Sequence, residues 1–252
     1  MNKKLELLIQ EFQLLSQGNV NFDKLAMYIS TFHSTSIEGS TLTENEVINL
    51  LSYNKTAKKP MEHHLMVLDH FEAFRFCLEK AKSKKLISIS FITELASLIT
   101  KNTGTKVNTA LGTYDISKGE LRLGGVFAGK RQFPDAKKVP LLLNKFIDEI
   151  NSGLKLAKSN EDKLILAFNA HFELVSIHPF GDGNGRISRL MMNYILAYFE
   201  LPMTIVFKQD RIKYIDALEA SRNKEDRTIF FKFMFAQYEK FIKKELKILK
   251  SN

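Results

Sequence analysis

The sequence is organised around one stretch, His178-Pro179-Phe180-Gly181-Asp182-Gly183-Asn184-Gly185-Arg186-Ile187-Ser188-Arg189. Apolar residues recur at helical spacing over residues 164–175, and residues 190–198 are almost continuously apolar. Three glycines at alternate positions allow the backbone between these segments to turn tightly and to approach a ligand. Pro179 should end the first helix at His178, because the residue before a proline is pushed out of the helical region. The stretch therefore predicts a loop between two helices.

The start of the second helix has the features of an anion site. Unpaired backbone N–H groups and the positive end of the helix dipole lie there. Arg186 and Arg189 stand three residues apart in its first turns, where the dipole disfavours positive charge. We therefore expect a strong anion in the loop, and we interpret it as a polyphosphate.

Two further residues of the loop suit chemistry on such an anion. Asp182 offers a hard carboxylate oxygen, which Mg²⁺ prefers together with water and phosphate oxygens. His178 titrates near neutral pH, which suits a general base acting on a hydroxyl. A glycine turn beside a surface histidine and two solvated arginines would explain each residue singly. No structural need explains the whole ordered set.

Residues 178–189 resemble the Fic-domain motif, H-x-F-x-(D/E)-G-N-G-R-x-x-R, at every specified position. The resemblance implies a mostly α-helical fold with one small β-hairpin and an enzyme that uses ATP and Mg²⁺ to attach AMP to a protein hydroxyl. It implies that His178 deprotonates the hydroxyl, that Asp182 holds the Mg²⁺ and that Phe180 anchors the loop in the core. The expected phosphate contacts come from Gly183, Asn184, Gly185, Arg186 and Arg189.

One position within the motif bears on the reaction. The Doc-type branch of the family, which phosphorylates its target, carries a lysine where this chain has Gly185. By resemblance, the glycine favours AMP transfer over phosphorylation.

A second motif ends the helix predicted over residues 22–37. Gly39 can cap this helix, and the helix dipole disfavours the carboxylate of Glu38, so Glu38 is either solvated or paired with a distant cation. The segment Ser34 to Gly39 resembles the Fic inhibitory motif, (S/T)-x-x-x-E-(G/N). The resemblance implies that Glu38, supported by Ser34, pairs with Arg189, blocks the γ-phosphate position and so inhibits the enzyme from an N-terminal helix.

The remaining chain is read mainly as helices. Their expected ranges are 4–16, 43–53, 61–82, 86–100, 139–151, 212–221 and 228–249, with a capping box at Thr43-Glu44-Asn45-Glu46. Five glycines and β-type runs at 121–123 and 125–127 predict a hairpin within residues 104–134.

The hairpin is an ordinary surface feature or, by resemblance, the Fic flap, which aligns a target segment by main-chain pairing. The resemblance places Ala128, Gly129, Lys130 and Arg131 closest to the nucleotide. It also places Arg222 where Fic proteins often carry an asparagine that contacts the nucleoside.

The composition bounds the class of protein. The 252 residues, 44% hydrophobic, suffice for one core, and we divide them into an N-terminal extension with the inhibitory helix (1–60), a Fic core (61–225) and a packed C-terminal helix (226–252). The net charge is +9, but the sequence has no clustered basic helix with interleaved aromatic residues. Nucleic acid is therefore not the expected partner. A single Cys77 and the absence of a signal-like or membrane-spanning run predict a cytoplasmic protein without membrane contact.

Several functions stay open at this stage. The principal prediction is transfer of AMP to a Ser, Thr or Tyr hydroxyl of a protein, with self-modification and a homodimer both compatible with the sequence. One alternative is the reverse enzyme, which removes AMP and uses Glu38 to position the attacking water. The other is a non-enzymatic nucleotide sensor or DNA-binding regulator.

Overall fold

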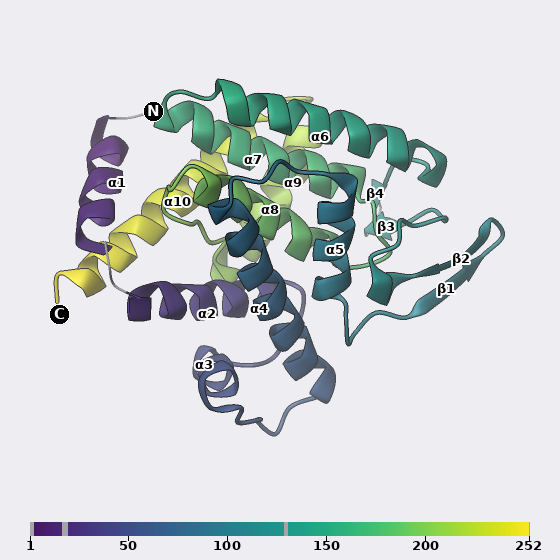
Figure 1. The fold of residues 1–252 in the computed structure, drawn as a ribbon, viewed down its shortest axis with the longest axis horizontal. Helices are drawn as coiled ribbons and strands as arrows, with labels where there is room; N and C mark the ends of the chain where they lie inside the picture. Colours follow the sequence, from purple (N-terminus) through teal and green to yellow (C-terminus); the bar gives the residue numbers. More distant parts are fainter. Residues whose placement is uncertain (1–2, 17–19, 129–130, 252) are drawn as a thin grey trace.

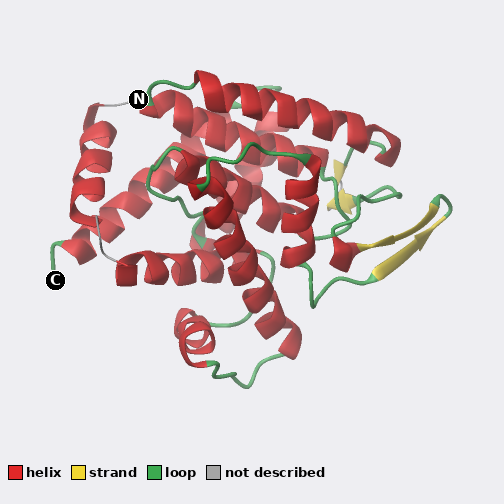
Figure 2. Ribbon diagram, viewed as in Figure 1, coloured by secondary structure: helices red, strands yellow, loops and turns green. Residues whose placement is uncertain are grey.

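The computed structural model describes residues 3–16, 20–128 and 131–251. Over these residues the chain forms ten α-helices and two short antiparallel ribbons, which confirms the mostly α-helical fold (Figures 1 and 2). The helices are α1 (Lys3–Ser16), α2 (Val20–Ile37), α3 (Glu44–Tyr53), α4 (Met61–Lys82), α5 (Ile89–Ile99), α6 (Val139–Leu156), α7 (Asn160–Ile177), α8 (Asn184–Tyr198), α9 (Arg211–Asn223) and α10 (Thr228–Leu249).

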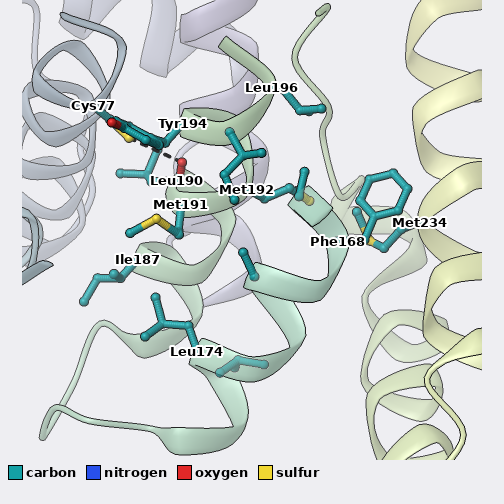
Figure 3. Close-up of a cluster of buried hydrophobic side chains, with 14 of the residues drawn as sticks. Cys77, Phe168, Leu174, Ile187, Leu190, Met191, Met192, Tyr194, Leu196 and Met234 are labelled. Carbon is teal, nitrogen blue, oxygen red and sulfur yellow. Dashed lines mark hydrogen bonds between the residues drawn. The ribbon is translucent and has the colours of Figure 1, made fainter. Parts of the chain in front are cut away.

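Helix α8 forms the centre of the fold. It packs against α7 and α4, and Asn184 and the whole run from Arg186 to Leu196 are buried. Figure 3 shows its apolar side chains meeting Leu174 and Phe168 of α7 and Cys77 of α4. Burying each leucine, isoleucine or methionine contributes about 1.5–3 kcal/mol, so α8 is a rigid support for the loop that precedes it.

The helix boundaries follow from local signals. The capping box at Thr43 and Glu46 is present at the start of α3, and a second one joins Ser159 and Asp162 at the start of α7. Helix α10 packs against α9 and α1, which places the apolar face of the C-terminal segment on the body of the protein. Among the helices that the structure describes, none has the length and apolarity to cross a bilayer.

The strands lie partly elsewhere than predicted. Ribbon β1 (Lys106–Thr109) and β2 (Gly112–Asp115) projects from the body, and β3 (Phe127–Ala128) pairs with β4 (Arg131–Gln132) beside it (Figure 1). The predicted strand at residues 121–123 is wrong. Arg122 there is 1% exposed, and its side chain bonds to three backbone carbonyls outside any ladder.

Candidate active site

The loop between α7 and α8 is held rigidly. Helix α7 ends at His178, whose φ of 53° lies in the left-handed region, and Pro179 follows directly. The side-chain amide of Asn184 bonds to both the N–H and the carbonyl of Phe180, at 3.0 and 2.9 Å. Phe180 itself is 2% exposed, as expected for an anchor. Gly183 precedes α8 with a φ of 80°, a conformation that glycine adopts without steric cost.

The imidazole of His178 is presented as a neutral base. Its Nδ1 lies 3.2 Å from the carbonyl oxygen of Val175, and because a carbonyl only accepts, this contact assigns the ring proton to Nδ1. The ring stacks on Phe133 with centroids 3.8 Å apart and an interplanar angle of 20°. Burial lowers the pKa of His178 to about 4. Its Nε2 is therefore unprotonated at neutral pH and can accept a proton.

His178 opens onto a pocket of about 550 Å³. The loop between α7 and α8, named the catalytic loop after its predicted role, contributes His178, and α8 contributes Gly185 and Arg189. Glu38, directly after α2, also lines the pocket. The remaining walls come from Val175 of α7, from α9 and from residues 131–133 of the segment 104–134, which is named the flap after its predicted role. They include Arg131, Phe133, Arg211, Tyr214, Leu218, Glu219 and Arg222. The pocket is thus lined by charged side chains, among them Glu38, Arg189 and Arg222, together with apolar ones such as Phe133 and Leu218.

Glu38 and Arg189 meet inside this pocket, 151 residues apart in the chain. Arg189 Nη2 lies 2.6 Å from Glu38 Oε1, and the arginine also donates to Ser34 Oγ and to the Ser34 carbonyl, at 2.9 and 3.0 Å. The distant cation expected for Glu38 is therefore Arg189. Ser34 accepts from the arginine, so the support expected from Ser34 reaches Glu38 through Arg189.

Gly185 makes this contact sterically feasible. A Cβ built at position 185 would lie 2.5 Å from Glu38 Oε1 and 3.1 Å from Arg189 Nη1. Real Cβ atoms essentially never approach another atom so closely as the first distance. The glycine thus leaves space for the glutamate as well as exposing its backbone to the pocket.

The two arginines of the motif, Arg186 and Arg189, make different contacts. Arg186 Nη2 lies 2.9 Å from Asp182 Oδ2, and Arg186 Nη1 donates to the carbonyl of Ile99 at 3.2 Å. The Arg186 side chain is 3% exposed and does not line the pocket. Its predicted contact with a phosphate stays a prediction, whereas in this structure it holds Asp182 in place.

Asp182 suits a magnesium ion that takes most ligands from elsewhere. Its side chain is 60% exposed although Oδ1 accepts from the Gly183 N–H at 2.6 Å and Oδ2 from Arg186. Across the described residues, the structure contains no cluster of three or more histidine, cysteine or acidic side chains for a fully protein-bound metal. A single accessible carboxylate fits Mg²⁺ that is completed by waters and phosphate oxygens.

The flap residues are only partly placed. Ala128 lies in β3, while Gly129 and Lys130 lie outside the described residues. Arg131 lines the pocket and lies 2.9 Å from Glu219 Oε2, and the other oxygen of Glu219 is 2.7 Å from Arg222. This bridge joins the flap to α9 beside the pocket.

Several residues of the site escaped the sequence analysis, among them Glu219, Phe133, Arg122 and Arg211. Glu219 could have been found, since it lies one helical turn before Arg222. Phe133, Arg122 and Arg211 carry no comparable local signal. Arg211 donates from its Nε to the carbonyl of Ile37 at 2.8 Å, so it holds the end of α2 from α9.

Comparison with known proteins agrees with this geometry. Residues 86–196 match the Fic/DOC family. A protein adenylyltransferase Fic from Drosophila willistoni is 32% identical over 213 residues, which are 84% of this chain and 40% of that protein. The chain thus spans about two fifths of the length of the curated relatives that it matches.

Solved structures share the fold. A Fic domain-containing signalling protein from Bacteroides thetaiotaomicron has a TM-score of 0.82 at 19% identity, covering 98% of this chain and 97% of that one. A Fic-1 fragment from C. elegans has a TM-score of 0.79 at 23% identity, covering 99% of this chain and 72% of the fragment.

Proposed function

We propose that this chain, which belongs to the Fic/DOC family, transfers AMP from ATP to a hydroxyl side chain of a target protein and is held in check by Glu38. The observation that carries the proposal is the convergence of a neutral His178, the start of α8 at Gly185 and the guanidinium of Arg189 on one pocket. The relatives named protein adenylyltransferase support the same reaction.

The proposed chemistry assigns each group one task. His178 Nε2 takes the proton of the hydroxyl as its oxygen bonds to the α-phosphorus, and the bond to the departing pyrophosphate breaks. The N–H groups and positive dipole end at the start of α8 stabilise the phosphate charge, because they already point at it before reaction. Arg189 would bind the outer phosphates, and Asp182 would hold Mg²⁺, which supplies Lewis-acid stabilisation when bound.

Glu38 opposes this arrangement by competing for Arg189. With the ion pair formed, the donors of Arg189 that face Ser34 and Glu38 are already satisfied. ATP can still enter the pocket, but its phosphates lose the contact that would align them for attack in line with the leaving group. In this proposal, release of Glu38 is the activating step.

The target is proposed to be a protein with an accessible Ser, Thr or Tyr hydroxyl, this chain itself included. The pocket lies beside the ribbon β3–β4, whose Phe127 is 67% exposed. An extended target segment could pair along such a ribbon and present a hydroxyl to His178.

The test uses ATP labelled at its α-phosphate together with Mg²⁺. We expect the Glu38→Gly variant to acquire label on itself or on added proteins, with release of pyrophosphate and a mass increase of one AMP per modified hydroxyl. The Glu38→Gly/His178→Ala variant should acquire none. Labelling that requires Glu38, or loss of AMP from a pre-labelled protein only when Glu38 is present, would favour the reverse enzyme. Nucleotide binding with no covalent product in any variant would favour a sensor.

A further inference from the structure

Arg122 lies buried between the catalytic loop and the flap. Its Nε donates to the carbonyl of His178 at 2.7 Å, Nη1 to that of Gly124 at 2.8 Å and Nη2 to that of Pro134 at 2.6 Å. Its own backbone N–H donates to the carbonyl of Pro179 at 3.0 Å. The residue is 1% exposed, so water does not replace these bonds.

Burying the Arg122 guanidinium costs free energy that an apolar side chain in the same space would not. A buried charge is costly unless it is well bonded, and the acceptors of the Arg122 guanidinium are carbonyls rather than a carboxylate. Burial accordingly lowers the pKa of Arg122, although the nearby Tyr114 and Asp135 act in the opposite sense. What the guanidinium offers is a planar fork of donors that reaches three separate backbone segments at once, which a lysine ammonium cannot do.

Two of those segments bear directly on the proposed base. One is the carbonyl of His178 itself, a non-glycine residue held at a φ of 53°. The other is Pro134, which follows Phe133, the ring that stacks on the imidazole at 3.8 Å. The same side chain thus holds the backbone of the base and the backbone of the residue that covers it.

We propose that Arg122 is a positioning residue for His178, one that joins the flap to the catalytic loop so that a target on the flap and the base keep a single geometry. The inference rests on the proposed roles of His178 as the base and of the flap as the target holder. Arg122 acts through His178 and Phe133 and touches neither nucleotide nor target.

The test compares Arg122→Lys with its parent, both in the Glu38→Gly background. The lysine keeps the positive charge, one of the charges acting on His178 along with Arg222 and Glu38, and removes only the fork. We expect kcat for AMP transfer to fall at least tenfold while KM for ATP stays within threefold, since the contacts of Gly185 and Arg189 are untouched. In an NMR titration, the pKa of His178, which burial lowers, should be higher in the Arg122→Lys variant than in the parent, because the ring loses its cover.

A matched control separates positioning from loss of stability. Ile9→Ala removes a 0% exposed side chain on α1, away from the site, and should lower the Tm while leaving kcat and the pKa of His178 unchanged. The proposal is overturned if Arg122→Lys lowers only the Tm, or if kcat and the pKa do not change together. If Arg122→Lys does not fold, Arg122→Gln takes its place. If neither variant folds while Ile9→Ala does, Arg122 is a structural residue and the proposal fails.

Failure of the proposed function would be seen separately. If the Glu38→Gly parent transfers no AMP, the adenylyltransferase assignment is in error. The titration of His178 requires no turnover and still decides whether Arg122 sets the environment of the ring.

Discussion

The carboxylate of Glu38, at the end of α2, lies 2.6 Å from the guanidinium of Arg189 on α8. Exposed ion pairs contribute little to stability, but the Arg189 side chain is only 5% exposed. A buried guanidinium without its carboxylate partner is costly, so Arg189 without Glu38 should bind another anion. This is the arrangement that the proposed inhibition requires, because Glu38 then occupies the guanidinium that is proposed to bind the outer phosphates of ATP.

Removing Glu38 should activate the enzyme. We expect Glu38→Gly to raise the rate of AMP transfer at least tenfold, which needs only about 1.4 kcal/mol of lost inhibition. Glu38→Gly/Arg189→Ala should be inactive again, because the arginine freed for the phosphates is gone. Ser34→Ala should activate weakly, since it removes one hydrogen bond to Arg189 of about 1 kcal/mol. Rates measured with labelled ATP check all three, and a folded Glu38→Gly protein as slow as the unmodified chain would contradict autoinhibition.

Adding one methyl group at position 185 should also raise the rate of AMP transfer, as removal of Glu38 should. Because the new Cβ would meet Glu38 Oε1 at 2.5 Å, Gly185→Ala should displace the glutamate and raise AMP transfer at least threefold, or about 0.7 kcal/mol. The substitution keeps the backbone N–H of position 185, which is proposed to bind phosphate. The control is Gly185→Ala in the Glu38→Gly background, where the clash with the carboxylate is gone, only the 3.1 Å approach to Arg189 Nη1 remains, and no further activation is expected. Equal effects in both backgrounds would show that the methyl group acts on something other than Glu38.

The pH dependence should reflect the buried environment of His178. Burial lowers its pKa to about 4, so the neutral base is present above that pH and is lost as pH falls through it. In the Glu38→Gly background we expect kcat/KM to hold between pH 8 and 6 and to decline on the acid side nearer pH 4 than 6.5. His178→Ala should abolish transfer with ATP affinity within about a factor of three. An acid limb near 6.5 would show that the ring is solvated in the working enzyme.

Asp182 offers a test of the magnesium site. Asp182→Asn keeps one oxygen, enough to accept from either Arg186 or the Gly183 N–H but not from both, and it removes the charge that a cation requires. In the Glu38→Gly background we expect a loss of at least a hundredfold in kcat at saturating ATP, about 2.7 kcal/mol, partly recovered at high Mg²⁺. Titration of activity against Mg²⁺ measures both effects. Activity that is indifferent to both the substitution and chelation of the metal would rule out this role.

Much of the molecule was readable from the chain alone, because the signals are local. The loop from His178 to Arg189 required a helix on either side, a proline stop and a glycine turn, and α7 and α8 have those boundaries. The capping box of α3 is likewise formed by residues three positions apart in the chain. The adverse position of Glu38 at a helix end left a distant cation as one of two alternatives, and the resemblance to the inhibitory motif favoured it.

Tertiary structure decided which distant groups meet. Neither the contact of Glu38 with Arg189 nor the steric role of Gly185 can be derived from spacing, since α2 and α8 come together only when the core forms between them. The same holds for Arg122, whose segment looked like a strand because its apolar neighbours alternate. Its side chain instead bonds to carbonyls brought from the loop and the flap. A local pattern fixes a backbone within a few residues, whereas buried polar groups must be satisfied by whatever backbone the fold places beside them.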